Sequence, residues 1–184
     1  MIETIFPKNF YYKFTPPNSK DLINFLSKNV NSNRNMHWDQ NCLVNAFCLS
    51  KEDWKNVFEY LTPSLDMISK EFSYTGSYEI DLPWLNHYSF NGFQELHIHP
   101  GSDLSLVFFI NDGKNFGQFY FYDRMSIEMP EAVKQLVDYE SCFYPEIKSG
   151  QFIVFPSTML HGVTPHKSKE IRKTFALNLN LIRS

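Results

Sequence analysis

The sequence predicts a mainly β fold, a β-sandwich or jelly roll supported by α-helices near the N-terminus. Aromatic residues favour strands; they make up 17% of the 184 residues and include 18 Phe and 10 Tyr. Apolar residues recur with a helical period early in the chain and alternate with a period of two from about residue 78. Gly, Asn and Asp turns separate the later apolar runs. We therefore predict one domain over residues 1–184, with mostly helical support at 1–75 and the jelly-roll core at 76–184.

The first fifty residues predict only short elements. Residues 1–18 combine aromatic residues with prolines and indicate a short strand or an extended arm. A short helix is expected to begin at Ser19, with Leu22 and Phe25 on its apolar face. The polar residues 31–41 predict a loop, which covers either a substrate pocket or ordinary surface. An apolar run at 42–49 indicates a strand.

A longer helix is predicted to start after Ser50. Ser50 and Asp53 have the spacing of a capping box, in which side chains satisfy the first backbone N–H groups of a helix. An apolar stripe follows at Trp54, Val57, Phe58 and Leu61. Pro63 interrupts this pattern, so we expect a second helical segment from there to about residue 71. The helix should lie outside one sheet and bury the stripe against Phe175 or Leu177.

The remaining chain reads mainly as strands. They are predicted over residues 84–90, 93–99, 104–110, 116–122, 151–155, 161–163 and 172–182. Residues 130–139 interrupt the strands with a helical pattern that has proline in its first turn. Strands separated by short turns, after a helical first part, favour two facing and mainly antiparallel sheets.

Two histidines on one predicted strand indicate a metal site. His97 and His99 are separated by one residue, and residues i and i+2 of a strand point to the same face. His161 follows a tight turn and opens a later strand. Three imidazoles on one side of a metal leave the opposite positions open for substrate or oxygen, unlike a closed structural zinc site. The alternative is that the His-x-His pair is simply a polar strand end.

The last predicted strand has two different faces. Arg172, Thr174, Ala176 and Asn178 alternate with the apolar residues Phe175, Leu177 and Leu179. The apolar face is expected to pack against the helices, so the polar face meets either solvent or a hydrated pocket. An arginine inside a barrel is suited to binding a carboxylate, because its planar guanidinium donates two parallel hydrogen bonds.

Several short motifs in the later part of the chain fit one family. They comprise Asn86, Gly92, His97-Ile98-His99-Pro100, Leu104-Ser105, Gly150 with Phe155-Pro156, His161-Gly162-Val163, Arg172 and Asn178. As a combined pattern they resemble the Fe(II)/2-oxoglutarate-dependent oxygenases. The resemblance is closest to a small branch of that superfamily that is common in marine phages and bacteria.

This resemblance implies a double-stranded β-helix, the jelly roll of that superfamily, with supporting N-terminal helices. It implies that His97, His99 and His161 hold Fe(II). It also implies that Arg172, with Thr174 and Tyr88, binds the distal carboxylate of 2-oxoglutarate. Asn86 and Asn178 belong to the same implied cofactor site. The implied reaction oxidises an unidentified substrate, by hydroxylation, and releases succinate and carbon dioxide.

One position departs from the usual pattern of the superfamily. Most members have H-x-D or H-x-E, so His99 replaces a carboxylate by a neutral imidazole. No carboxylate restores the motif at the correct spacing, although Asp103 lies near enough in the sequence to approach the metal. Two alternatives to an oxygenase stay open: a cupin-type three-histidine dioxygenase that does not use 2-oxoglutarate, and a non-catalytic jelly-roll binding protein. Arg172 distinguishes them, because only the 2-oxoglutarate enzyme requires it in the pocket.

Composition sets the expected surroundings of the protein. The formal net charge of −3 argues against a general nucleic-acid binder, so a small molecule or a protein side chain is the favoured substrate. Three scattered cysteines do not form a disulfide framework, and no signal peptide or membrane-length apolar stretch is found. We therefore expect a cytoplasmic protein that binds no membrane, in the host cytoplasm if it is phage-encoded. A homodimer is left open.

Overall fold

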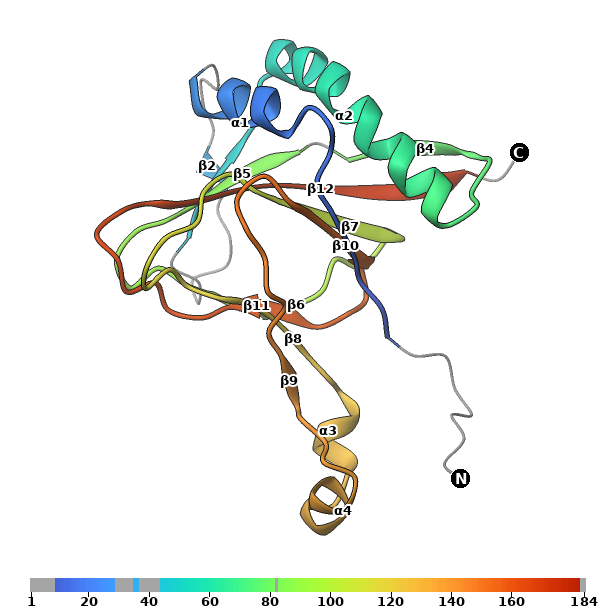
Figure 1. The fold of residues 1–184 in the computed structure, drawn as a ribbon, viewed down its shortest axis with the longest axis vertical. Helices are drawn as coiled ribbons and strands as arrows, with labels where there is room; N and C mark the ends of the chain where they lie inside the picture. Colours follow the sequence, from blue (N-terminus) through green and yellow to red (C-terminus); the bar gives the residue numbers. More distant parts are fainter. Residues whose placement is uncertain (1–8, 29–34, 37–43, 82, 183–184) are drawn as a thin grey trace.

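The computed structural model describes residues 9–28, 35–36, 44–81 and 83–182. Two sheets face each other in this structure, and helices cover the outer face of the larger one (Figure 1). Among the described residues, the larger sheet has eight strands in the order β1-β10-β7-β12-β5-β3-β2, with β4 also pairing with β12. The smaller sheet has the order β6-β11-β8-β9. All described strand pairs are antiparallel, as predicted.

The elements have the following bounds. The larger sheet comprises β1 (Tyr12–Phe14), β2 (Asn35–Met36), β3 (Asn45–Cys48), β4 (Ser77–Ile80), β5 (Trp84–Tyr88), β7 (Leu104–Phe109), β10 (Phe152–Pro156) and β12 (Arg172–Ile182). The smaller sheet comprises β6 (Gln94–His97), β8 (Phe119–Tyr122), β9 (Cys142–Phe143) and β11 (His161–Val163). The helices are α1 (Ser19–Lys28), α2 (Lys51–Glu71), α3 (Met125–Glu128) and α4 (Glu131–Leu136).

The path of the chain between the sheets identifies the fold. From β5 to β8 the chain alternates between the larger and the smaller sheet, and after β9 it alternates again up to β12. This winding makes a double-stranded β-helix, which confirms the predicted jelly roll with supporting helices at its N-terminal end. Among the described residues, no helix combines the length and apolar character needed to cross a membrane.

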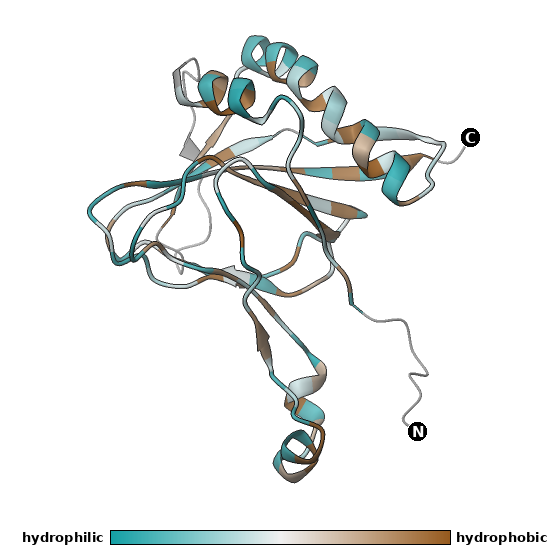
Figure 2. Cartoon of the chain, in the orientation of Figure 1, coloured by the Kyte–Doolittle hydropathy of each residue, from teal (hydrophilic) through white to brown (hydrophobic). Residues whose placement is uncertain are grey.

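The main core lies between the larger sheet and the helices. Phe175, Leu177 and Leu179 on β12 are fully buried there, as the alternation of this strand predicts. They share one cluster with α2 residues such as Leu61 and Ile68. Figure 2 shows hydrophobic residues concentrated in the strands of the larger sheet, while hydrophobic and hydrophilic residues alternate along α2. The helices therefore anchor one face of β12 and leave its other face directed at the smaller sheet.

Two expectations about α2 are wrong. Phe58 is 44% exposed, because the buried face of the helix runs through Val57, Leu61, Ser64 and Ile68, and Phe58 lies one position around from it. The helix also continues through Pro63 as a single element. Burial of Leu61 before the proline and Ser64 after it holds both halves on the same sheet, which offsets the lost backbone hydrogen bond. Ser50 caps the helix as predicted, with its hydroxyl accepting from the Asp53 N–H at 3.0 Å.

Other elements differ from the predicted ones mainly in the residues at which they begin and end. The strand predicted over 93–99 ends at His97, and the helix predicted over 130–139 is the shorter α4, preceded by α3. Residues 31–34 and 37–43, which include most of the predicted loop and the start of a predicted strand, lie outside the described residues. Between β8 and β9, α3 and α4 form an arm that extends away from the smaller sheet (Figure 1).

Replacing Phe175 by alanine is expected to destabilise the fold strongly. Its side chain is fully buried in the centre of β12, where removal of the ring leaves a cavity between sheet and helices. The expected loss is about 3–5 kcal/mol in the free energy of unfolding. Denaturant unfolding of the two proteins measures the difference, with Phe58→Ala as the exposed control on α2. A loss for Phe175→Ala no larger than that of the control would contradict this placement of the core.

Candidate active site

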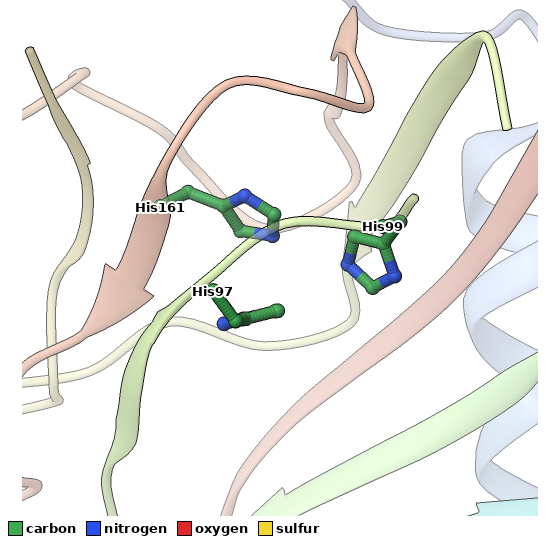
Figure 3. Close-up of side chains that lie close together, drawn as sticks. All are labelled: His97, His99 and His161. Carbon is green, nitrogen blue, oxygen red and sulfur yellow. The ribbon is translucent and has the colours of Figure 1, made fainter. Parts of the chain in front are cut away.

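The fold brings three histidines from two strand ends together. His97 is the last residue of β6 and pairs directly with His161, the first residue of β11. His99 lies two residues beyond the end of β6. One ring nitrogen from each residue lies within 4.8 Å of those from the other two. The rings surround one common space (Figure 3).

Backbone carbonyls fix the orientation of two of these rings. Nδ1 of His97 lies 2.8 Å from the carbonyl oxygen of Glu95, and Nδ1 of His161 lies 2.9 Å from that of Met159. A carbonyl oxygen only accepts hydrogen bonds, so each Nδ1 carries the proton and each Nε2 presents a lone pair. Metal-binding histidines commonly have this arrangement, because the second hydrogen bond sets both the tautomer and the ring direction.

Burial keeps the three imidazoles in the neutral form that binds metals. Removal from water lowers the pKa of His97, although the Glu95 carbonyl and carboxylate oppose this shift. Burial, with the nearby His97, lowers the pKa of His99 to about 4. The same two causes lower the pKa of His161 well below its ordinary value. Neutral imidazole suits Fe(II) and other first-row metals, so this donor set fits an iron ion.

The metal-free protein is expected to lose stability on acidification. The three pKa values lie below the ordinary value of 6.5, so the unfolded chain binds more protons than the folded chain in acid. The free energy of unfolding should therefore fall as the pH drops below about 6.5 and keep falling towards about 4, where His99 titrates. Denaturant unfolding across this range measures the slope. His99→Asn should make it shallower, and an unchanged slope would contradict the assignment.

All eight site residues predicted from the sequence line one cavity. They are His97, His99, His161, Asn86, Tyr88, Arg172, Thr174 and Asn178. Together with the other lining residues they surround about 370 Å³ of space not filled by atoms, including the part open to solvent. Arg172 and Thr174 begin β12, and Tyr88 and Asn86 are their direct partners on β5. The polar face of β12 therefore lines a pocket, and the solvent interpretation of that face is wrong.

Arg172 is a buried cation that has no anionic partner among the described residues. Its side chain is 3% exposed, and its guanidinium carbon lies 4.7 Å from the centre of the Tyr88 ring and 5.4 Å from that of Phe109. Within the described residues, Nη1 is buried without a hydrogen-bond partner, and the only ion pair is Lys134–Glu131. Burial lowers the pKa of Arg172, while Tyr88 opposes the shift. An unpaired buried charge is costly, so this arrangement indicates an anionic ligand.

The amide and hydroxyl residues of the cavity are paired across strands. Asn86 and Thr174 face each other on β5 and β12, with the Asn86 Nδ2 at 3.5 Å from the Thr174 hydroxyl. The Ser105 hydroxyl donates to Asn178 Oδ1 at 2.9 Å and lies 2.8 Å from the Ser157 hydroxyl. These contacts fix the polar side chains of Asn86, Thr174, Ser105 and Asn178 in the lining of the cavity.

The sequence pattern missed some of the residues that line the cavity. Gln94 and Trp84 line the cavity beside the histidines, but strict alternation along 93–99 would direct Gln94 away from His97. Asp103 is near enough in the sequence to approach the metal, but it does not line the cavity, and its carboxylate accepts from the Leu181 N–H at 2.8 Å. Among the described residues that line the cavity, none carries a carboxylate.

Comparison with known proteins gives the family. Residues 83–178, just over half of the chain, match the sequence model of a family described as "Putative 2OG-Fe(II) oxygenase". These residues include all eight predicted site residues. No curated protein matches the chain significantly.

Solved structures of low sequence identity share the fold. An oxidoreductase of the 2OG-Fe(II) oxygenase family from Burkholderia pseudomallei aligns with a TM-score of 0.66 and 12% identity, over 92% of this chain and 84% of that one. HygX from Streptomyces hygroscopicus, with nickel and 2-oxoglutarate bound, aligns with a TM-score of 0.65 and 11% identity, over 94% of this chain and 83% of that one. A Pseudomonas putida prolyl-4-hydroxylase aligns with a TM-score of 0.62 and 12% identity, over 95% of this chain and 94% of that one.

The family match, the double-stranded β-helix and the three-histidine cavity all agree. The chain therefore belongs to the 2OG-Fe(II) oxygenase family, and it is an Fe(II)/2-oxoglutarate-dependent oxidoreductase.

Proposed function

We propose that this oxygenase hydroxylates its substrate at an iron held by His97, His99 and His161. Arg172 binds the distal carboxylate of 2-oxoglutarate, and the Thr174 hydroxyl supports it. One observation carries the assignment of the cofactor site: a buried arginine with an unpartnered Nη1 lines the same cavity as the three histidines. Tyr88, Asn86 and Asn178 complete the cofactor-binding wall.

The charges of the cavity suit a dicarboxylate. Arg172 is the only charged residue among the described residues that line it. The three imidazoles are neutral, so a divalent iron keeps its full positive charge at the other end. A dianion with one carboxylate at each end offsets both charges, which a neutral ligand cannot do. The replacement of the usual carboxylate by His99 therefore makes the need for an anionic cofactor greater.

Bound at this site, iron and 2-oxoglutarate would supply the oxidation of a substrate C–H bond by dioxygen, with conversion of 2-oxoglutarate to succinate and carbon dioxide. The chain itself orients and shields these groups. The Glu95 and Met159 carbonyls hold the His97 and His161 rings in place. The rings of Tyr88 and Phe109 flank the Arg172 guanidinium and hold its donors inside the cavity. Phe119, packed against His161 with ring centres 5.5 Å apart, closes one side against water.

The position of Arg172 favours this function over the two alternatives. A cupin-type dioxygenase and a non-catalytic binding protein do not require a buried arginine in the cavity that the histidines line. Without an anionic ligand, an arginine is better solvated at the surface. Its 3% exposure is therefore the feature that separates the three hypotheses.

The substrate is proposed to be a small molecule or a protein side chain. The net charge of −3 disfavours the phosphate backbone of a nucleic acid. The arm between β8 and β9 favours a protein segment as the substrate. It starts beside the histidines, where the Tyr122 N–H donates to the Leu160 carbonyl, and it exposes apolar side chains. They are Met125, Ile127, Val133, Leu136 and Val137.

Reconstitution of the metal-free protein tests the proposed function. Fe(II), 2-oxoglutarate and oxygen are added without substrate, and succinate is measured, because oxygenases of this class consume the cofactor slowly when uncoupled. Calorimetry of 2-oxoglutarate binding to the nickel-loaded protein gives a second readout that needs no turnover. The proposal predicts that binding depends on the metal. If the nickel-loaded protein does not bind 2-oxoglutarate, the proposed function is wrong.

A further inference from the structure

Gln94 lies beside a proposed iron ligand and has no role in the function described so far. Its side chain is 6% exposed and lines the cavity. Its Oε1 accepts a hydrogen bond from the Tyr88 hydroxyl at 2.8 Å. Its Nε2 lies 3.4 Å from Nε2 of His97. The amide thus lies between the two groups assigned to opposite ends of the cofactor, since the Tyr88 ring packs on Arg172.

A β-bulge places this residue in the cavity. Between the paired positions, β6 advances three residues from Gln94 to His97 while β11 advances two from Val163 to His161 (97 − 94 against 163 − 161). In a regular strand Gln94 and His97 would point to opposite faces, but the extra residue turns both inward. Bulges of this kind next to active sites commonly redirect a side chain.

The hydrogen bonds fix which end of the amide faces the histidines. Tyr88 donates, so the amide oxygen must be the atom on its side, and the NH₂ group faces His97. His97 uses its Nδ1 proton on the Glu95 carbonyl, so its Nε2 accepts from Gln94 in the metal-free protein. A metal on Nε2 takes that lone pair, and the NH₂ group then requires another acceptor beside the metal.

We propose that Gln94 is a cofactor-binding residue, whose NH₂ group donates to the 2-oxoglutarate carboxylate that lies next to His97. This inference rests on the proposed function. Arg172 then holds one end of the dicarboxylate and Gln94 the other, with Tyr88 in contact with both. A hydrogen bond from a buried amide to a carboxylate is stronger than one between neutral groups. Gln94 would therefore add affinity and set the direction in which the cofactor enters the cavity.

Two variants separate this donor from simple packing. Gln94→Met keeps the length of the side chain and removes the donor. Gln94→Glu keeps its shape and the acceptor for Tyr88, but directs a carboxylate at the cofactor. Gln151→Leu, in the turn before β10, is the control, because its Oε1 accepts only from the Lys148 N–H in the described contacts. Nickel-loaded proteins are titrated with 2-oxoglutarate by calorimetry, and nickel content and thermal stability are measured in parallel.

The expected result is a Kd for 2-oxoglutarate about tenfold higher in Gln94→Met and higher still in Gln94→Glu. Nickel content should stay close to that of the unchanged protein, and the control should bind normally. Under anaerobic conditions, the visible absorption band of the Fe(II)–2-oxoglutarate complex should shift in both variants, because the lost donor changes the electron density of the carboxylate. A role limited to packing would not move this band.

Three outcomes would overturn the inference. The first is normal 2-oxoglutarate affinity in Gln94→Met while Arg172→Lys weakens binding, which leaves the proposed function intact. The second is loss of nickel from the Gln94 variants before any cofactor is added, which would make Gln94 a support for His97. The third is a lack of 2-oxoglutarate binding by the unchanged nickel-loaded protein, which refutes the proposed function as well. If Gln94→Met does not fold, the same comparison is made with Gln94→Glu.

Discussion

Replacing His161 by alanine is expected to abolish tight metal binding and, with it, succinate formation. The residue contributes one of three converging ring nitrogens, and no carboxylate among the described cavity residues is available to replace it. Loss of a partner that only supports a metal ligand already costs about 10- to 100-fold in metal affinity, so loss of the ligand itself should cost more than about 100-fold. Metal content after dialysis, and titration with Co(II) or Ni(II), measure this effect.

The matched control is His87→Asn. His87 is a half-buried histidine on β5 of the larger sheet, and its ring packs against Phe47 with centres 5.0 Å apart and does not line the cavity. This variant should keep its metal. Retention of stoichiometric metal by His161→Ala would exclude the three-histidine site, whatever its effect on turnover. Thermal stability of both variants shows whether the loss is local.

Strand periodicity predicted much of the fold and one wall of the site. The alternation along residues 172–182 correctly assigned Phe175, Leu177 and Leu179 to the core and Arg172 and Thr174 to the opposite face. That information is local, because each successive side chain of a strand points to the other face. The pairing of this strand with β5 was not predicted. Asn86 and Tyr88 were assigned to the cofactor site by the family resemblance, and the structure places them in register with Thr174 and Arg172.

What the pattern missed depends on contacts between distant segments. A bulge is defined by the partner strand, so the inward position of Gln94 cannot be read from residues 93–99 alone. The burial of one helix face decides between Val57 and Phe58, which are both apolar and adjacent. Continuation of α2 through Pro63 likewise depends on the packing of residues on both sides against the sheet. The position of the Asp103 carboxylate likewise depends on a distant segment, because it accepts from the Leu181 N–H of β12.

Replacing Arg172 by lysine is expected to weaken 2-oxoglutarate binding by about 10- to 100-fold while metal content stays nearly unchanged. Lysine keeps the positive charge but lacks the planar pair of donors. Its single ammonium group cannot make two parallel hydrogen bonds to one carboxylate. Calorimetry on the nickel-loaded proteins measures the affinity. Equal affinity in the lysine variant would remove Arg172 from the cofactor site.

A second substitution at this position distinguishes a cofactor-binding role from a structural one. Arg172→Met removes a buried cation that has no anionic partner among the described residues. The free energy of unfolding of the metal-free variant should therefore be at least as large as that of the unchanged protein. The unchanged protein, loaded with nickel, should gain about 2.7 kcal/mol of stability at 2-oxoglutarate concentrations near 100 times Kd. The methionine variant should gain almost nothing. If Arg172 served the fold, the methionine variant would instead be destabilised before any ligand is added. A buried arginine that is unfavourable without its ligand and favourable with it is therefore the thermodynamic signature of an anion site.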